Sequence, residues 1–157
     1  MKKAKGRDPG ASQCHCTTLR KASRHISQLY DDALADSGLK TTQRSILNQI
    51  ARAQPLTVRR LADAMVMDAS ALAHTLKPLE RDGLVAIGVD PHDRRNRQIT
   101  LTDLGRVKLD ESEAAWVAAQ RGFEAALGKV DSESLGEALR YLVSETFTTD
   151  FVQSRTA

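Results

Sequence analysis

Two short stretches within residues 57–84 carry apolar side chains at the spacing of an α-helix. In the first stretch these positions are Leu61, Ala62 and Met65. In the second they are Leu72, Leu76 and Leu79. Each stretch follows a residue suited to cap a helix, Thr57 and Asp68 respectively, and Gly83 stands where a left-handed C-cap is favoured. The pattern predicts two helices joined by a short turn, the second over residues 69–82.

A pattern of period two follows in residues 85–102. Apolar residues alternate with small or polar ones on both sides of a polar tip: Val85, Ile87, Val89, Ile99 and Leu101. Alternation of β-branched residues around a Pro-containing tip is typical of a β-hairpin. Three arginines stand near the tip: Arg94, Arg95 and Arg97. Two helices followed by such a hairpin predict a winged helix-turn-helix.

Helical spacing also marks the sequence on either side. We expect one helix over residues 19–34 and another over 42–53, which Pro55 ends. After the hairpin we expect one long helix from Thr102 to Leu127. A last helix then carries an apolar stripe: Leu135, Leu139, Leu142, Val143, Phe147 and Phe151. The predicted fold class is mainly α with a small β-hairpin wing.

The terminal helices carry more apolar surface than one winged-helix core can bury. An exposed apolar stripe of that length favours aggregation unless another subunit covers it. We therefore expect residues 14–38 and 102–157 to form a helical dimerisation region and residues 39–101 the DNA-binding head. The alternative is a helical cap folded over its own domain. Residues 1–13 are expected to be a flexible basic arm, which either contacts DNA or serves as a solubilising tail.

The outer face of the second helix and the hairpin carry candidate DNA contacts. Small and hydroxylated residues near a helix start allow close approach to bases, and His and Lys reach base edges or phosphates. Guanidinium groups on a thin loop can enter a minor groove, where negative potential is concentrated. The candidates are Ser70, Ala71, His74, Thr75, Lys77, Arg94, Arg95 and Arg97. Each feature alone also fits a solvated surface, and the combination favours DNA.

Charge and composition agree with this division. Residues 1–99 hold 17 Lys and Arg against 10 Asp and Glu, whereas residues 100–157 hold 6 against 10. No apolar run approaches the roughly 18 residues of a membrane span. The basic N-terminal sequence lacks the apolar run of a secretory signal, so we expect a cytoplasmic protein. The sequence has no phosphate-binding loop, nucleophile elbow or metal-ligand spacing, so we expect neither an enzyme nor a cofactor.

In this order the motifs resemble those of the multiple-antibiotic-resistance regulator (MarR) family of winged-helix transcription factors. The resemblance rests on the helical residues 19–51 and on LKPLERDGLV (76–85), DPHDRRNRQITLT (90–102) and LTDLGRVKL (101–109). One departure is Val66, at a turn position where glycine is often found. The resemblance implies a homodimer joined by its first and last helices. Such a dimer binds a pseudo-palindromic operator in double-stranded DNA, and we expect it to act as a repressor.

Cysteine oxidation is one candidate control signal. Cys14 and Cys16 flank His15 at the start of the first helix, and the chain has no other cysteine. A helix N-terminus and nearby cations lower a thiol pKa and favour oxidation. Some relatives, the organic-hydroperoxide-sensing regulators, carry a reactive cysteine near this place. The alternatives are two cysteines without a redox role or a metal site, for which no tetrahedral ligand set is evident.

A small aromatic effector is the other candidate signal. The resemblance implies a ligand cleft between the dimer helices and the head, and the candidate lining residues are Arg24, His25, Tyr30 and Trp116. Each is equally consistent with a packed core side chain. The alternative function is a winged-helix module for protein interaction, but the polar outer face of residues 69–82 favours DNA over that reading.

Overall fold

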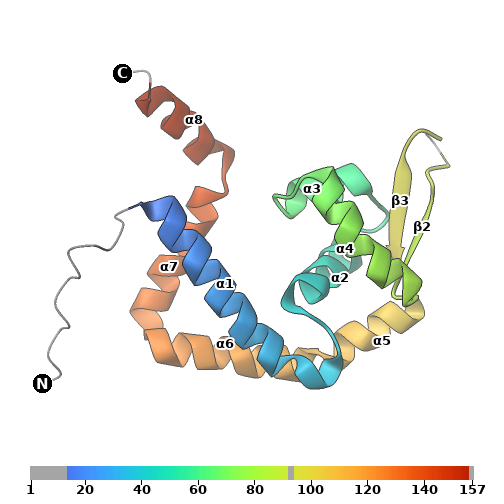
Figure 1. Ribbon diagram of the computed structural model, residues 1–157, viewed down its shortest axis with the longest axis horizontal. Coiled ribbons are helices and arrows are strands. Elements are labelled where there is room, and N and C mark those ends of the chain that lie inside the picture. Colours follow the sequence, from blue (N-terminus) through green and yellow to red (C-terminus); the bar gives the residue numbers. More distant parts are fainter. Residues whose placement is uncertain (1–13, 92–93, 156–157) are drawn as a thin grey trace, which may run out of the picture.

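A winged head and a helical arm make up the part of the chain that the computed structural model describes, residues 14–91 and 94–155 (Figure 1). The predicted basic arm over residues 1–13 lies outside the described residues. The elements in chain order are α1 (His15–Ala33), η1 (Ala35–Ser37), α2 (Thr41–Ala53), β1 (Leu56–Thr57), α3 (Val58–Ala64), α4 (Ala69–Arg81), β2 (Val85–Val89), β3 (Arg97–Leu101), α5 (Asp103–Glu111), α6 (Glu113–Leu127), α7 (Lys129–Leu142) and α8 (Glu145–Ser154). We call α2 to β3 the head and α1 with α6–α8 the arm, and α5 connects them.

The head has the predicted helix-turn-helix and wing. The Thr57 side chain accepts a hydrogen bond from the Arg60 amide at the start of α3, and the Asp68 carboxylate caps α4. Strands β2 and β3 pair antiparallel, with Ile87 opposite Ile99. The short strand β1, which the sequence pattern did not predict, adds to the other edge of β3. The predicted fold class, mainly α with a small wing, is therefore confirmed.

Aliphatic side chains from every element of the head form one core. Its completely buried members, at 0% exposure, are Ile46, Leu47, Ile50, Leu61, Leu72, Leu79 and Ile99. Leu109 of α5 joins the same cluster. Helix α2 packs against α3, α5 and β3 as well as against α1. It thus occupies the centre of the head and also reaches the arm.

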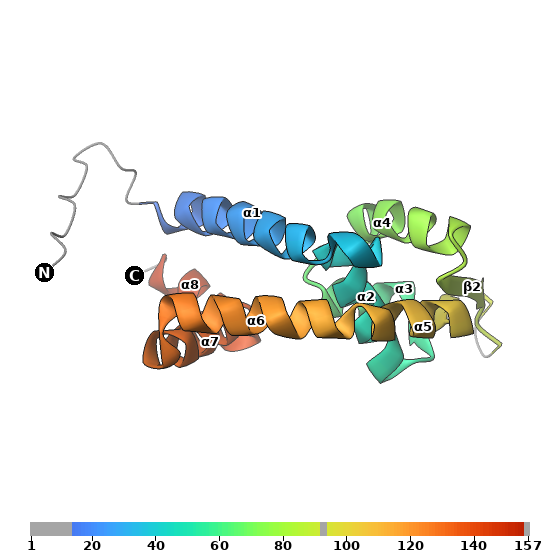
Figure 2. The same cartoon turned by 90° about the horizontal axis from the view of Figure 1, so that it is seen from below.

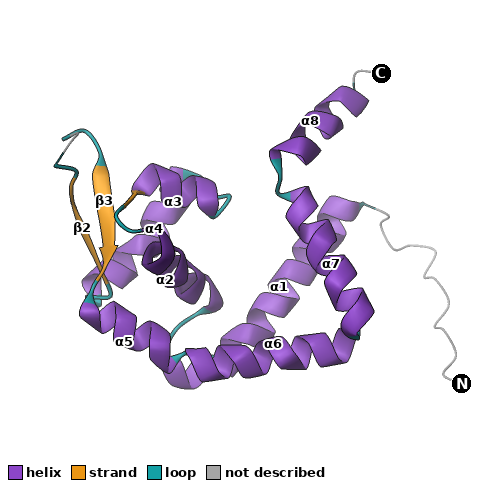
Figure 3. Ribbon diagram, turned by 180° about the vertical axis from the view of Figure 1, so that it is seen from behind, coloured by secondary structure: helices purple, strands orange, loops and turns teal. Residues whose placement is uncertain are grey.

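The arm, by contrast, has no fully buried side chain in the described part of α1, α6, α7 or α8. Helix α1 runs beside α6 (Figure 2), and the Tyr30 hydroxyl donates a 2.8 Å hydrogen bond to the Gln120 side-chain oxygen. Helix α7 turns back from the far end of α6, and α8 lies on the opposite side of the molecule from the wing (Figure 3). Large apolar side chains remain exposed there: Val130, Leu139, Tyr141, Val143, Phe151 and Val152. None of the described helices combines the length and apolar content of a membrane span.

Two of the predicted helices are interrupted, and the expectation of one helix from Thr102 to Leu127 is wrong. It breaks at Ser112, whose hydroxyl donates a 2.6 Å hydrogen bond to the Leu109 carbonyl. The predicted last helix is likewise divided into α7 and α8, where the Ser144 side chain accepts a 3.1 Å hydrogen bond from the Phe147 amide. A serine hydroxyl competes with the backbone for such hydrogen bonds, which favours helix ends.

A close backbone approach joins α5 to the base of the wing. A β-carbon on Gly105 would lie 2.0 Å from the Leu84 carbonyl oxygen, so only glycine fits there. The Thr102 hydroxyl accepts from the Gly105 amide at 2.9 Å and donates to the Gly83 carbonyl at 2.6 Å. The sequence LTDLG (101–105) therefore caps α5 and connects it to the residues that lead into β2.

The two helices of the helix-turn-helix end in the same way but with different residues. After α4, the amide of Leu84 donates to the Leu79 carbonyl at 2.8 Å across Gly83, whose φ is 73°. After α3, the amide of Met67 donates to the Ala62 carbonyl at 2.9 Å across Val66. Val66 has a φ of 51° and is 72% exposed. A β-branched residue therefore holds a left-handed conformation without the compensation of burial.

Replacing Val66 by glycine should stabilise the protein. A non-glycine residue in this conformation destabilises the folded state by roughly 1–2 kcal/mol. Glycine removes this strain, but its greater conformational freedom in the unfolded state offsets about 0.5–1 kcal/mol of the stability gained. We expect Val66→Gly to raise the free energy of unfolding by about 0.5–1 kcal/mol in urea titration. Gly83→Ala is the matched control, since its β-carbon meets only Leu104 at 3.8 Å, and it should lower stability. A loss of stability in Val66→Gly would contradict the strain.

Candidate nucleic-acid interface

The buried leucines of α4 determine which of its residues face outward. Leu72, Leu76 and Leu79 are buried in the head. Three predicted contact residues, Ser70, His74 and Lys77, are exposed. Their spacing of four and three residues places them on one face. The outer face of α4 therefore presents a hydroxyl, an imidazole and an ammonium group along one line.

The other two residues predicted on this helix lie closer to the core. Ala71 and Thr75 are half-buried, and the Thr75 hydroxyl donates to the Ala71 carbonyl at 3.1 Å. The hydroxyl proton of Thr75 is thus held by the helix itself, while its oxygen can still accept a hydrogen bond. Asp68 accepts from the amides of Ser70 and Ala71, both at 2.9 Å, and so holds the first turn in place.

The wing carries its three predicted arginines on exposed positions. Arg94 and Arg95 lie at the tip, and Arg97 opens β3 opposite Val89. Within the tip, the Asp90 amide donates to the Asn96 carbonyl at 3.0 Å. The pairing of β2 with β3 thus projects the arginines away from the core of the head.

A cleft of about 580 Å³ separates the wing from the start of α4 and from α3. Arg95 and Arg97 line it from the wing, and Asp68 lines it from the N-terminus of α4. Arg59, in the first turn of α3, also lines this cleft and was not among the predicted site residues. A sequence signal for Arg59 does exist, because a cation in the first turn of a helix opposes the helix dipole and needs another reason to be there.

The two cysteines are exposed at the beginning of the arm. Cys14 is the N-cap residue of α1, and Cys16 lies in its first turn. Hydrogen bonds from the Thr17 side chain and backbone hold the pKa of the Cys14 thiol below its ordinary value. The thiolate is the reactive form, so Cys14 meets two requirements for oxidation, exposure and a lowered pKa. Within the described residues, no group of three His, Cys, Asp or Glu side chains converges as a metal site.

The four residues predicted to line a ligand cleft are spread over α1 and α6. Tyr30 borders an apolar cleft of about 380 Å³ between α1 and α6, whose other walls include Leu29 and Phe123. Burial and the nearby carboxylate of Glu124 raise the pKa of Tyr30, so its hydroxyl stays neutral at physiological pH.

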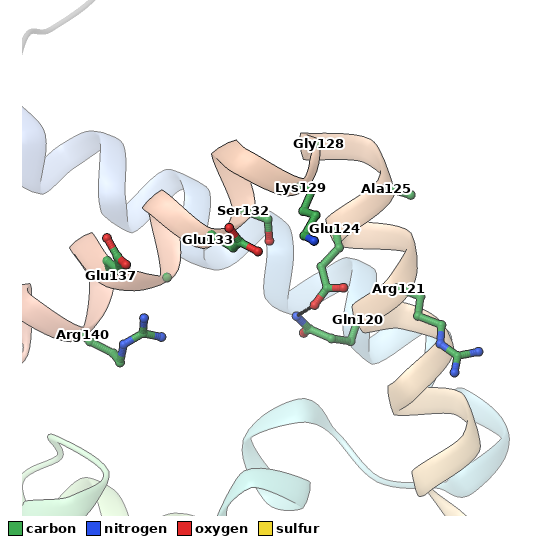
Figure 4. A pocket seen from close by; sticks show the side chains of 11 residues that line it. Gln120, Arg121, Glu124, Ala125, Gly128, Lys129, Ser132, Glu133, Glu137 and Arg140 are labelled. Carbon is green, nitrogen blue, oxygen red and sulfur yellow. Dashed lines mark hydrogen bonds between the residues drawn. The ribbon is translucent and has the colours of Figure 1, made fainter.

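The other three candidates lie elsewhere. Arg24 and His25 are exposed on α1, and Trp116 lies half-buried on α6 beneath the guanidinium of Arg44. A larger pocket of about 830 Å³ opens where α6 meets α7. Figure 4 shows that basic, acidic and uncharged polar side chains surround it. None of the four predicted ligand residues lines that pocket.

Comparison with known proteins identifies the family to which this architecture belongs. A sequence model of the MarR family matches residues 37–96, which run from the end of η1 into the wing. The transcriptional regulator MosR of M. tuberculosis, solved in complex with DNA, is 34% identical; the likeness covers 82% of this chain and 97% of that chain, with a TM-score of 0.69. The chain belongs to the MarR family. Its members are winged-helix transcriptional regulators and, as a rule, not enzymes.

Other relatives agree with this MarR assignment. The HTH-type transcriptional regulator SarZ of Staphylococcus epidermidis is 31% identical over 91 residues, which is 58% of this chain but only 62% of that relative's own length. SarZ of Staphylococcus aureus is 27% identical over 132 residues, covering 84% of this chain and 88% of its own. A MarR-family regulator from Rhodococcus, at 22% identity and a TM-score of 0.72, covers 85% of this chain and 99% of its own and shares the fold.

Proposed function

We propose that this MarR-family protein is a homodimeric, sequence-specific DNA-binding repressor. The observation that carries the proposal is that the head exposes the polar outer face of α4 and that Arg59, Arg95 and Arg97 line a cleft between the wing, α3 and the start of that helix. The head buries its apolar side chains without using that face, so nothing in the fold itself requires three arginines beside it. A regulator with 34% identity, MosR, is known in complex with DNA, which supports the same partner for this chain.

In the proposed complex, α4 lies in the major groove and the wing reaches the adjacent minor groove. Ser70, His74 and Lys77 then face base edges and phosphates, with Ala71 and Thr75 at the margin. The tip arginines, Arg94 and Arg95, enter the minor groove. The alternative of a protein-interaction module is less favoured, since such a module needs apolar anchors on the outer face of α4.

The arm supports the proposed dimer. Its helices expose apolar side chains and bury none of them fully, so a second copy would remove this surface from water. A two-fold dimer holds two α4 helices about one turn of DNA apart, and the expected operator is therefore a pseudo-palindrome.

Two signals are proposed to release the DNA. One is oxidation of Cys14 and Cys16, whose exposure at the start of the arm suits a disulfide between subunits. The other is a small aromatic molecule in the apolar cleft beside Tyr30. The walls of that cleft belong to α1 and α6, so either signal acts on the arm. A signal of this kind must favour one spacing of the heads over another.

Removing a wing arginine should weaken binding without changing the preferred sequence. We expect Arg94→Ala to lower affinity for all duplexes and to reduce the slope of log affinity against log salt by about one unit. Titration of a labelled duplex at several salt concentrations measures both. Arg121→Ala, an exposed arginine on α6, is the matched control and should leave the slope unchanged. An unaltered slope in Arg94→Ala would remove the wing from the interface.

Changing the outer face of α4 should instead alter the sequence that is read. His74→Ala is expected to lose about 1–3 kcal/mol of discrimination at one base position. Selection from a random-duplex pool compares the preferred motif of this variant with that of the wild type. The same motif from both proteins would show that His74 reads no base.

Peroxide should affect the wild type more than a protein that lacks both thiols. We expect peroxide to weaken DNA binding by the wild type, and dithiothreitol to restore it, because the proposed disulfide is reversible. The Cys14→Ser, Cys16→Ser double variant should bind DNA equally before and after treatment. Equal behaviour of the two proteins would reject the redox signal and leave the small molecule.

A further inference from the structure

A buried arginine joins the head to the beginning of the arm. Arg44, in α2, is only 6% exposed, and its guanidinium forms an ion pair with the carboxylate of Glu113. Its Nε donates a 3.0 Å hydrogen bond to Oγ of Ser112. The guanidinium carbon lies 4.5 Å from the centre of the Trp116 ring. One side chain of the head therefore contacts three residues at the joint between α5 and α6.

The backbone hydrogen bonds that connect Ser112 to α5 are long. The Ser112 amide divides its hydrogen bonding between the carbonyls of Lys108, at 3.3 Å, and Leu109, at 3.2 Å. Both distances are at or beyond the long end of the usual range for such bonds. Ser112 is nevertheless fully buried, at 0% exposure, and Arg44 of α2 donates to its hydroxyl. Contacts from α2 thus supply stiffness that the backbone lacks at the point where the head meets the arm.

We infer that Arg44 is a positioning residue for DNA recognition, which locks the α5–α6 joint and fixes the angle between head and arm. The inference rests on the proposed DNA-binding dimer. In that dimer the arms are held together, so the angle at each joint sets the separation of the two α4 helices and the half-site spacing that is accepted. A guanidinium suits this task, because it donates in two directions while its face stacks on an aromatic ring.

Two variants separate positioning from stability. Arg44→Met keeps an unbranched side chain of similar length without the charge. It leaves no buried charge behind, since the Glu113 side chain is 57% exposed and remains solvated. Glu113→Gln removes only the ion pair. Arg52→Met is the matched control, because Arg52 is exposed on the same helix.

The experiment measures affinity as a function of half-site spacing. A duplex is first selected by the wild type, and its spacer is then lengthened by about two base pairs, roughly one fifth of a DNA turn. We expect the wild type and Arg52→Met to lose about tenfold or more in affinity, and Arg44→Met and Glu113→Gln to lose less than about threefold. Affinity for the unaltered duplex should fall as well, since a freer joint has more arrangements to lose on binding.

The chain's only tryptophan, Trp116, gives a second measurement that does not depend on DNA. Loss of the stacked cation should change its fluorescence emission in Arg44→Met and not in Arg52→Met. Folded variants that keep the wild-type spacing preference would overturn the inference. If Arg44→Met shows no cooperative unfolding, and is therefore not properly folded, the spacing preference of Glu113→Gln alone tests the inference. A wild-type protein that selects no duplex would instead refute the proposed function, and the positioning role with it.

Discussion

The position of α4 depends on three leucines. Leu72, Leu76 and Leu79 enter the core of the head, and their burial fixes the rotation of the helix about its own axis. The opposite face is therefore left to small and polar side chains, and the carboxylate of Asp68 orders the first turn of that helix. Hydrophobic burial, which is not directional by itself, becomes directional here through helical spacing. The chemistry offered to a partner is a consequence of where the leucines must go.

The head and the arm satisfy the demand for burial in different ways. The head encloses a complete aliphatic core, whereas the arm helices form a frame whose apolar side chains remain partly in water. Helix α2 contacts both parts. Since Arg44 extends from α2 to the first residues of α6, a polar contact connects the part that has a complete core to the part whose apolar side chains remain exposed. The boundary between head and arm, at the joint of α5 and α6, is therefore where a movement of the arm would be transmitted to the head.

Local patterns in the sequence predicted the helices of the head, their caps and the hairpin, because spacing and capping act over a few residues. Strand β1 escaped prediction, since two residues carry no periodicity and pair with β3 through the fold alone. The break at Ser112 escaped as well, because the Arg44 that hydrogen-bonds to it is 68 residues away in the chain. Ser70, His74 and Lys77, which were predicted as DNA contacts, are exposed on the outer face of α4. Of the four ligand candidates, Tyr30 borders the apolar cleft between α1 and α6. The spacing of residues does not reveal which neighbour covers each face of a long helix.

Gly105 couples the orientation of the wing to the position of α5. Its backbone lies so near the Leu84 carbonyl that α5 cannot slide or roll there without displacing Leu84, the residue directly before β2. A shift that begins in the arm and travels along α5 would therefore reach the segment between α4 and the hairpin, where the Leu84 amide also donates to the Leu79 carbonyl of α4. Any side chain at position 105 would separate the two segments. The absence of a β-carbon on Gly105 therefore keeps α5 in direct contact with the base of the wing.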